Sequence, residues 1–217
     1  MLRKKDFLLF ENHPGLIYFD AAATSQKPAA VLDMQRQWYE KYNANVHRGL
    51  YNLSIFATNE YEKSRQQIAG YFGVSPKETI FIRNTTEGLN LIAQSYQRYL
   101  KSGDNIVISA LEHHSNILPW REVAKNKECE IRTIGIKDGR IDLDSAIKLI
   151  DNRTEIVSIA HVSNVFGTVQ PIKEIADIAH SVGAIMIVDG AQAVAHLRFS
   201  PWEFGADAYV FSGHKIY

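Results

Sequence analysis

The stretch EIVSIAHVSNVFGTVQPIKEIADIAHSVGAIMIVDG (residues 155–190) decides the fold. Two apolar runs, EIVSIAHV (155–162) and AIMIVD (184–189), flank a segment with helical spacing that begins at Pro171 and ends at Gly183. The apolar residues on one side of that helix are Ile172, Ile175, Ala179 and Val182. Because both runs are apolar almost throughout, each strand is expected to be buried on both faces, which is typical of a parallel sheet covered by helices.

The same alternation of strands and helices extends toward both ends of the chain. We expect further strands at TIFI (79–82), NIVIS (105–109) and AYVFS (208–212), and a helix from Ser54 to Gly73. Two more sets of apolar residues have helical spacing: Val31, Met34, Trp38 and Tyr42, and Leu89, Ile92, Tyr96 and Tyr99. The sequence therefore predicts an α/β fold of three layers, with a mostly parallel sheet and helices on both faces.

The composition excludes several classes of function. The 217 residues include 24 basic and 24 acidic residues, so the charge indicates neither a nucleic-acid partner nor a membrane surface. One cysteine, Cys129, is too few for a disulfide framework or a cysteine-based zinc site in this chain. The apolar run Phe7 to Phe10 is too short for a signal peptide, and no apolar stretch is long enough to cross a membrane. We expect a cytoplasmic protein.

Small or polar residues follow each predicted strand. The segments are RNTTEG after TIFI, ALEHHSN after NIVIS, SN after EIVSIAHV, DGAQ after AIMIV, and SGHK after AYVF. In an open α/β sheet, ligands bind beyond the carboxyl ends of the strands. We therefore expect these residues to line one ligand crevice.

Three of these segments have a functional and a structural interpretation. Thr85 and Thr86 begin a helix, where hydroxyl and backbone N–H groups bind phosphate, or they form a simple N-cap with an acidic first turn. Asp189 is either a carboxylate paired with a protonated ring nitrogen or a loop aspartate. Lys215 is either a solvated lysine or an amine that forms a Schiff base with an aldehyde.

Taken together, these groups match the requirements of pyridoxal 5′-phosphate (PLP). The cofactor needs a phosphate site, a carboxylate for its pyridine nitrogen and a lysine for its aldehyde, and His113 or His114 is able to lie flat on its ring. Neither G-x-G-x-x-G nor G-x-x-x-x-G-K-[ST] occurs, which argues against a nucleotide site. Adjacent histidines lack the spacing of helical metal ligands, so we expect no metal site.

Seven motifs in this order resemble the group II (SufS-type) cysteine desulfurases of PLP fold type I. The motifs are YFDAAATSQKP, NVHRGLYNLS, TTEGLN, EHHSNILPW, HVSNVFGTVQP, VDGAQAV and FSGHKIY. The resemblance extends from about Leu16 to Tyr217, and EHHSNILPW and HRGLYNLS are more similar to the SufS branch than to the IscS/NifS branch.

The resemblance implies roles for individual residues. Lys215 would form the Schiff base with the cofactor, and His113 would stack on the cofactor ring. Asp189 would pair with the pyridine nitrogen, and Gln192 would form a hydrogen bond to the phenolic oxygen. The cofactor phosphate would lie among four side chains: Thr85, Thr86, Ser212 and His214.

Three further positions resemble substrate-contacting residues of the family. Asn164 would contact the substrate or a cofactor oxygen, and His47 and Arg48 would lie at the entrance of the active site. No metal ligand is implied.

The resemblance also implies a domain organisation. Residues 1–16 would form an N-terminal arm and residues 17–217 a truncated PLP-binding large domain, because the enzymes of the family continue well beyond the lysine motif. The missing part would hold the small domain, a substrate-binding arginine, a phosphate-binding residue lent across the dimer and the cysteine nucleophile. Cys129 is a poor substitute for that cysteine because its acidic neighbours raise the pKa of a thiol.

For the complete protein, the resemblance implies conversion of L-cysteine to L-alanine. The sulfur would be passed as a persulfide to an acceptor protein for iron-sulfur cluster assembly, and the enzyme would be a homodimer. A selenocysteine lyase and another fold type I PLP aminotransferase or lyase are alternatives. A non-catalytic fragment is a third, and we expect residues 1–217 alone to be inactive.

Overall fold

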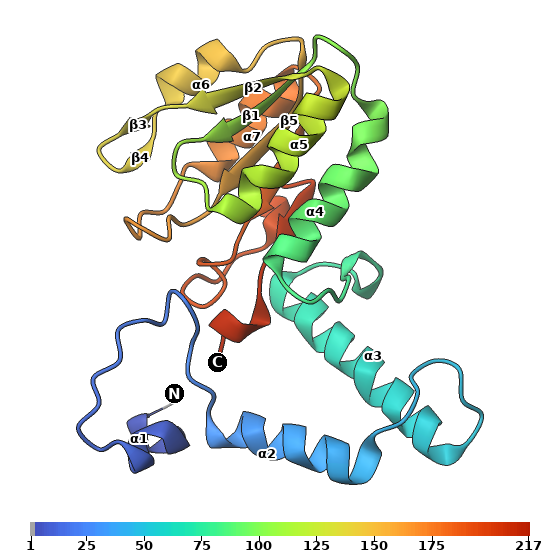
Figure 1. Cartoon of the computed structure of the whole chain (residues 1–217). Coiled ribbons are helices and arrows are strands. Elements are labelled where there is room, and N and C mark those ends of the chain that lie inside the picture. The colour runs from blue at the N-terminus through green and yellow to red at the C-terminus, as the bar shows by residue number, and fades with distance from the viewer. Residues whose placement is uncertain (1–2) are drawn as a thin grey trace. The chain divides into compact units, whose positions relative to one another are not determined.

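The computed structural model describes residues 3–217 and divides them into two compact units. The first unit comprises residues 3–80 together with His214–Tyr217, and the second unit is Phe81–Gly213. Within the described chain, the strands all lie in the second unit (Figure 1). The predicted division into an arm (1–16) and a large domain (17–217) stays a prediction.

The second unit is built on a parallel sheet of five strands in the order β2-β1-β5-β6-β7. The strands are β1 (Asn105–Ser109), β2 (Glu130–Ile134), β5 (Thr154–Ala160), β6 (Ile185–Asp189) and β7 (Ala208–Val210). A small antiparallel pair, β3 (Ile136–Lys137) and β4 (Arg140–Ile141), lies outside this sheet. Parallel neighbours need crossover connections, and the helices supply them.

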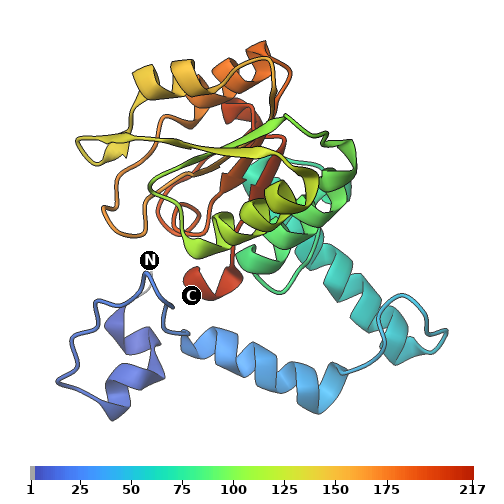
Figure 2. The same ribbon diagram turned by 45° about the horizontal axis from the view of Figure 1, so that its top comes forward.

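Helices cover both faces of the sheet. Four helices do so: α4 (Thr85–Tyr96), α5 (Leu118–Lys127), α6 (Leu143–Leu149) and α7 (Ile172–Ser181). Short helical turns are η4 (Gln97–Tyr99), η5 (His114–Asn116), η6 (Pro201–Phe204) and η7 (Gly213–Lys215). Helices α4 and α5 lie on one face of the sheet and α6 and α7 on the other, as Figures 1 and 2 show together. This arrangement confirms the predicted three layers.

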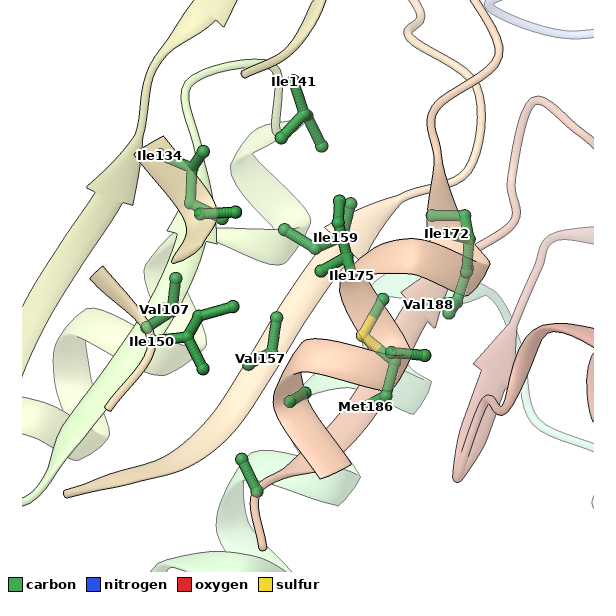
Figure 3. Packing of buried hydrophobic residues seen from close by; sticks show 14 of the residues in the cluster. Val107, Ile134, Ile141, Ile150, Val157, Ile159, Ile172, Ile175, Met186 and Val188 are labelled. Carbon is green, nitrogen blue, oxygen red and sulfur yellow. The ribbon is translucent and has the colours of Figure 1, made fainter. Parts of the chain in front are cut away.

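Alternate residues of the strands build two separate cores. Val107, Val157 and Met186 belong to the cluster that packs against α6 and α7 (Figure 3). Ile106 and Ile156 belong to the cluster that packs against α4 and α5. Fully burying one such side chain contributes about 1.5–3 kcal/mol. The apolar runs of the sequence are thus explained by burial on both faces.

The first unit is helical. Its elements are η1 (Lys4–Asp6), α1 (Leu8–Asn12), α2 (Ala29–Gln37), a π-helical turn η2 (Trp38–Tyr42), α3 (Asn52–Phe72) and η3 (Pro76–Glu78). The predicted helix from Ser54 to Gly73 is confirmed within two residues at its start. Gly73 ends α3 with a φ of 67°, and its N–H donates to the carbonyl of Ala69.

The predicted strand at TIFI (79–82) is wrong. Residues 79–82 have no strand conformation and pair with no other strand of the described chain. The carbonyl of Thr79 instead accepts a hydrogen bond from the Arg65 guanidinium, and the side chain of Ile80 is 71% exposed. An apolar run forms a strand only where a neighbouring strand supplies hydrogen bonds, and no local pattern reveals that neighbour.

None of the helices in residues 3–217 combines the length and the apolar character that a membrane span requires.

Candidate functional site

The carboxyl ends of the five parallel strands meet at one edge of the sheet, where the second unit carries most of the predicted site residues. His113 follows β1, and Asn164 follows β5. Asp189 is the last residue of β6, with Gln192 three residues later, and Ser212 follows β7. The structure therefore brings these segments to the edge where α/β folds bind ligands.

Thr85 and Ser212 are joined at the start of α4. The backbone N–H of Thr85 donates to Ser212 Oγ over 2.8 Å, and the two hydroxyl oxygens lie 2.7 Å apart. Both side chains are buried. Two residues 127 positions apart in the chain thus place two hydroxyl groups at a helix N-terminus, whose partial positive charge favours an anion.

The simple N-cap interpretation of the two threonines is wrong, because Asn84 is the N-cap of α4. The Asn84 side chain accepts a hydrogen bond of 2.9 Å from the N–H of Glu87. The Glu87 carboxylate bonds to the backbone N–H of Arg83 and its guanidinium, and these bonds lower the pKa of Glu87. The threonine hydroxyls are therefore not needed to cap the N-terminus of α4.

Thr86 and His113 are linked through Ser115. Thr86 Oγ1 lies 2.8 Å from Ser115 Oγ, which lies 3.0 Å from His113 Nδ1. The backbone N–H of Ser115 also donates to His113 Nδ1 over 3.2 Å. Since a backbone N–H only donates, Nδ1 accepts and the neutral ring carries its proton on Nε2. Sequence reasoning missed Ser115, although its hydroxyl follows His113 by two positions in the motif EHHSN.

Asp189 is a buried carboxylate at the end of β6. Its side chain is 5% exposed, and Oδ1 accepts a hydrogen bond of 2.9 Å from the N–H of Ala191. This bond is typical of an aspartate at the start of a turn, and both interpretations of Asp189 stay predictions. The carboxylate charge nevertheless acts on its surroundings, because it helps to raise the pKa of both Glu112 and Tyr209. A cation beside Asp189 would be stabilised by that charge.

Tyr209 supports the turn that follows Asp189. Its ring lies so close to Gly190 that a Cβ atom there would come within 2.0 Å of a ring carbon. Tyr209 Oη lies 2.8 Å from Nδ1 of His161, a buried residue whose backbone N–H donates to the carbonyl of Asp189. Burial lowers the pKa of His161 to about 4 and raises the pKa of Tyr209. No sequence pattern indicated this pair.

Asn164 and Gln192 lie in loops of the second unit. Asn164 is exposed, in a turn held by Ser163 Oγ, which accepts from the N–H groups of Val165 and Phe166 over 3.3 and 3.1 Å. Gln192 is half-buried. Their proposed contacts with a substrate or cofactor stay predictions.

Lys215 lies in η7 and is half-buried. The carbonyl of the preceding residue, His214, accepts hydrogen bonds from Ser25 N–H, Ser25 Oγ and Lys27 Nζ at 3.1, 3.0 and 2.8 Å. Ser25 Oγ in turn accepts from the N–H of Tyr217 over 2.7 Å. The motif ATSQKP thus holds the backbone on both sides of the lysine, a link between sequence-distant motifs that sequence reasoning missed.

His214 itself faces Thr24, with 3.2 Å between Nδ1 and Oγ1. Burial lowers its pKa, as do the nearby positive charges of Lys215 and Lys27. A neutral His214 is a hydrogen-bonding group rather than a cation. Its predicted place at the phosphate stays a prediction.

His47 and Arg48 also belong to the first unit. His47 has a φ of 70°, its N–H donates to Thr58 Oγ1 over 2.9 Å, and its Nε2 lies 3.3 Å from Glu62 Oε1. Arg48 is exposed. Because His47, Arg48, His214 and Lys215 lie in the other unit from Asp189, their membership of one site with it stays a prediction.

Neither a metal centre nor an activated thiol is found in the described part of the chain. No group of three His, Cys, Asp or Glu side chains among residues 3–217 is placed to bind a metal. Cys129 Sγ lies 3.3 Å from the carbonyl of Lys101, and its pKa is raised by burial and by Asp104. A raised pKa leaves less of the reactive thiolate. The direction agrees with the expectation, but its causes are burial and Asp104 rather than the adjacent residues Glu128 and Glu130.

Known proteins are similar to this chain over nearly all of its length. A protein of Halalkalibacterium halodurans named probable cysteine desulfurase is 49% identical over 208 residues, which are 94% of this chain and 51% of that protein. A cysteine desulfurase of Synechococcus elongatus is 41% identical over 220 residues, covering 99% of this chain and 35% of that protein. The chain thus spans about half, or less, of the length of these relatives.

The apo structure of cysteine desulfurase from Thermococcus onnurineus NA1 superposes with a TM-score of 0.93 and 39% identity, covering 100% of this chain and 55% of that chain. The predicted fold, the large domain of PLP fold type I, is confirmed by this likeness. Residues 17–217 match the family described as aminotransferase class-V. The resemblance to cysteine desulfurases is confirmed at this level, whereas the assignment to the SufS-type branch stays a prediction. The chain belongs to the aminotransferase class-V family.

Proposed function

We propose that this chain is the cofactor-binding part of a PLP-dependent cysteine desulfurase of the SufS type. The complete protein would convert L-cysteine to L-alanine and pass the sulfur, as a persulfide, to an acceptor protein of iron-sulfur cluster assembly. The observation that carries the proposal is the hydroxyl pair Thr85–Ser212, which ties the N-terminus of α4 to the segment leading to Lys215. The identity to proteins named cysteine desulfurase supports the choice of substrate.

The donor set fits the cofactor. A phosphate would be bound by the N-terminus of the 12-residue helix α4 and by the hydroxyl groups of Thr85, Thr86 and Ser212. The buried carboxylate of Asp189 would balance the charge of a protonated pyridine nitrogen. Lys215 would hold the cofactor aldehyde through its amine. When bound, PLP supplies an electron sink for the bonds at the substrate Cα atom.

The remaining roles belong to side chains of this chain. Lys215, once released from the cofactor, would move the Cα proton of the substrate. His113 would lie on the cofactor ring in the orientation that its bond to Ser115 sets. Gln192 and Asn164 would donate hydrogen bonds to cofactor or substrate oxygens. His47 and Arg48 would line the entrance.

The sulfur-accepting thiolate would come from outside residues 1–217. Cys129 is unsuited to that role because its pKa is raised. We further propose that the protein is cytoplasmic and that residues 1–16 form an arm beside a large domain of residues 17–217.

A second copy of the protein is the proposed partner of the first unit. Large apolar side chains are exposed along α2, η2 and α3: Val31, Leu32, Met34, Tyr39, Leu53, Ile55 and Phe56. Exposed apolar groups in such numbers are typical of an interface. A homodimer would bury them.

The proposed activity is tested with the natural gene product that contains these residues. With PLP, L-cysteine and a reductant, it should release alanine and sulfide in equal amounts. Lys215→Ala should abolish this release and also the absorbance of covalently bound cofactor, while a control variant, Lys148→Ala on the exposed side of α6, should retain both. Production of a keto acid in place of alanine would contradict the proposal and favour an aminotransferase.

A further inference from the structure

Glu112 is a buried acid directly before His113 that the proposed function does not use. The residue is 9% exposed. Its Oε1 atom accepts a hydrogen bond of 3.0 Å from the N–H of Ala160 and another from the hydroxyl of Ser109. Its Oε2 atom accepts a bond of 2.6 Å from Asn116 Nδ2. Both carboxyl oxygens are thus held by donors from three different segments.

The direction of the bond between Asn116 and Glu112 is set by the neighbours of Asn116. Its Oδ1 atom accepts from Trp120 Nε1 over 3.0 Å and from Ser158 Oγ over 2.6 Å. Because an indole N–H only donates, the amide oxygen must face Trp120 and the amide nitrogen must face Glu112. Asn116, Trp120 and Ser158 have no exposed surface, so water does not replace any of these bonds.

The bond to Ala160 completes the end of the sheet. Strand β1 pairs with β5 as far as Ile108 and Ser158, and the chain then turns away after Ser109. On the side of β5 that faces β1, the N–H of Ala160 therefore has no strand carbonyl as its acceptor. It donates to the Glu112 carboxylate instead. On its other side, Ala160 is in register with Asp189 of β6. Glu112 therefore connects the turn that carries His113 with the strand end beside Asp189.

The electrostatic surroundings of Glu112 are dominated by burial. Burial raises its pKa to about 7, and the charge of Asp189 contributes in the same direction. The bonds from Ser109, Ala160 and Asn116 lower the pKa and offset part of this effect. A neutral side chain would be easier to bury at this strand end.

We propose that Glu112 is a positioning residue of the cofactor site, whose carboxyl group fixes the His113 turn against the end of β5 and so sets how the imidazole lies relative to Asp189. This inference rests on the proposed function, which gives His113 and Asp189 their roles. A purely stabilising buried acid would make the same contacts without affecting His113.

A swap of donor and acceptor separates the two possibilities. Glu112→Gln alone sets two amide NH₂ groups against each other, because Asn116 is unable to turn while Trp120 donates to its oxygen. In the double variant Glu112→Gln/Asn116→Asp, the new glutamine oxygen accepts from Ala160 and Ser109, and its NH₂ group donates to the new aspartate. That aspartate still accepts from Trp120 and Ser158, so each hydrogen bond is retained while the charge moves to residue 116.

The experiment uses the natural gene product that contains these residues. It measures the ¹⁵N chemical shifts of the His113 ring, the midpoint of thermal unfolding and the dissociation constant of PLP. Glu112→Gln should shift the His113 Nδ1 and Nε2 resonances, lower the midpoint and weaken PLP binding about tenfold, the usual effect of losing a buried hydrogen bond. The double variant should restore all three. The control Ile175→Ala, in the core on the α7 face, should lower the midpoint and leave the His113 shifts unchanged.

Two outcomes overturn the inference. Unchanged His113 shifts in Glu112→Gln, with a lower midpoint, would show that Glu112 only stabilises the fold. Recovery of the midpoint without recovery of the His113 shifts in the double variant would show that hydrogen-bond geometry is not what positions the ring. Absence of PLP binding in the unmodified protein would instead reject the proposed function, and the His113 shifts would still decide whether Glu112 positions that residue.

Discussion

The two units of the chain differ in how they bury apolar side chains. The second unit encloses a cluster on each face of its sheet, and Ile134, Ile175 and Met186 in one of them are fully buried. In the first unit, α3 spans 21 residues, yet its fully or nearly buried side chains are few: Ser54, Ala57, Ala69 and Phe72. The second unit therefore carries its own core, whereas the first unit leaves large apolar side chains exposed, among them Met34 and Phe56.

The largest expected effect contrasts a core aromatic residue with a surface one. Trp120→Ala should lower the free energy of unfolding by about 3–5 kcal/mol, because it empties a fully buried site. Phe19→Ala in the first unit, where the ring is 94% exposed, should change it by less than about 0.5 kcal/mol. Urea unfolding followed by fluorescence and circular dichroism measures both. Equal losses would contradict the contrast between the units.

A smaller effect concerns two buried titratable groups of the second unit. Burial raises the pKa of Glu112 to about 7, above the value of about 4.3 in unfolded chains, so its contribution to stability is present at low pH and is lost as the pH rises toward 7. Burial lowers the pKa of His161 to about 4, below about 6.5, so its contribution is present at neutral pH and is lost as the pH falls toward 4. The two contributions therefore oppose each other.

His161→Gln should expose the Glu112 contribution. Between pH 4.5 and 6.5, the variant's free energy of unfolding should fall with rising pH by about 1–3 kcal/mol more than that of the unmodified protein. Urea midpoints at the two pH values, with Glu112→Gln/His161→Gln as the control without either group, provide the measurement. An unaltered pH dependence in His161→Gln would mean that burial does not lower the pKa of His161 as stated.

A third prediction addresses the apolar surface of the first unit. Met34→Glu, at a side chain that is 61% exposed, should change the free energy of unfolding by less than about 0.5 kcal/mol under conditions where the protein is a monomer. It should weaken self-association of the natural gene product, because a carboxylate is costly in an apolar interface. Sedimentation at several concentrations tests this, with Lys63→Glu on the polar side of α3 as the control. Unaltered self-association would show that this surface is not part of the proposed dimer interface.

The smallest effect is expected at Cys129. Cys129→Ser should leave alanine release from cysteine unchanged in the natural gene product, since a thiol of raised pKa is a poor nucleophile. An assay of alanine beside the unmodified protein suffices. A large loss of activity would require a sulfur-accepting role within the second unit.

Local patterns predicted α2, α3, α4 and α7 and four of the five strands of the parallel sheet, but neither α6 nor β2. The apolar runs at 105–109, 155–162 and 184–189 contain β1, most of β5 and β6, and the spacing after Pro171 predicted the start of α7 within one residue and its end within two. These features depend on the spacing of apolar residues within a single segment, which can be read without knowing the neighbours of that segment in space. The same pattern predicted that Asp189 lies at the end of an apolar strand.

The tertiary structure alone decided the contacts between segments. Whether residues 79–82 form a strand depends on a pairing partner, and the pairing of Thr85 with Ser212 spans 127 positions. The environment of Glu112 is likewise set by Asn116 and Ala160, which reach it only after β1 and β5 have paired. Hydrogen bonds and burial are properties of neighbours in space, and the period of a sequence carries no information about which distant segment those neighbours come from.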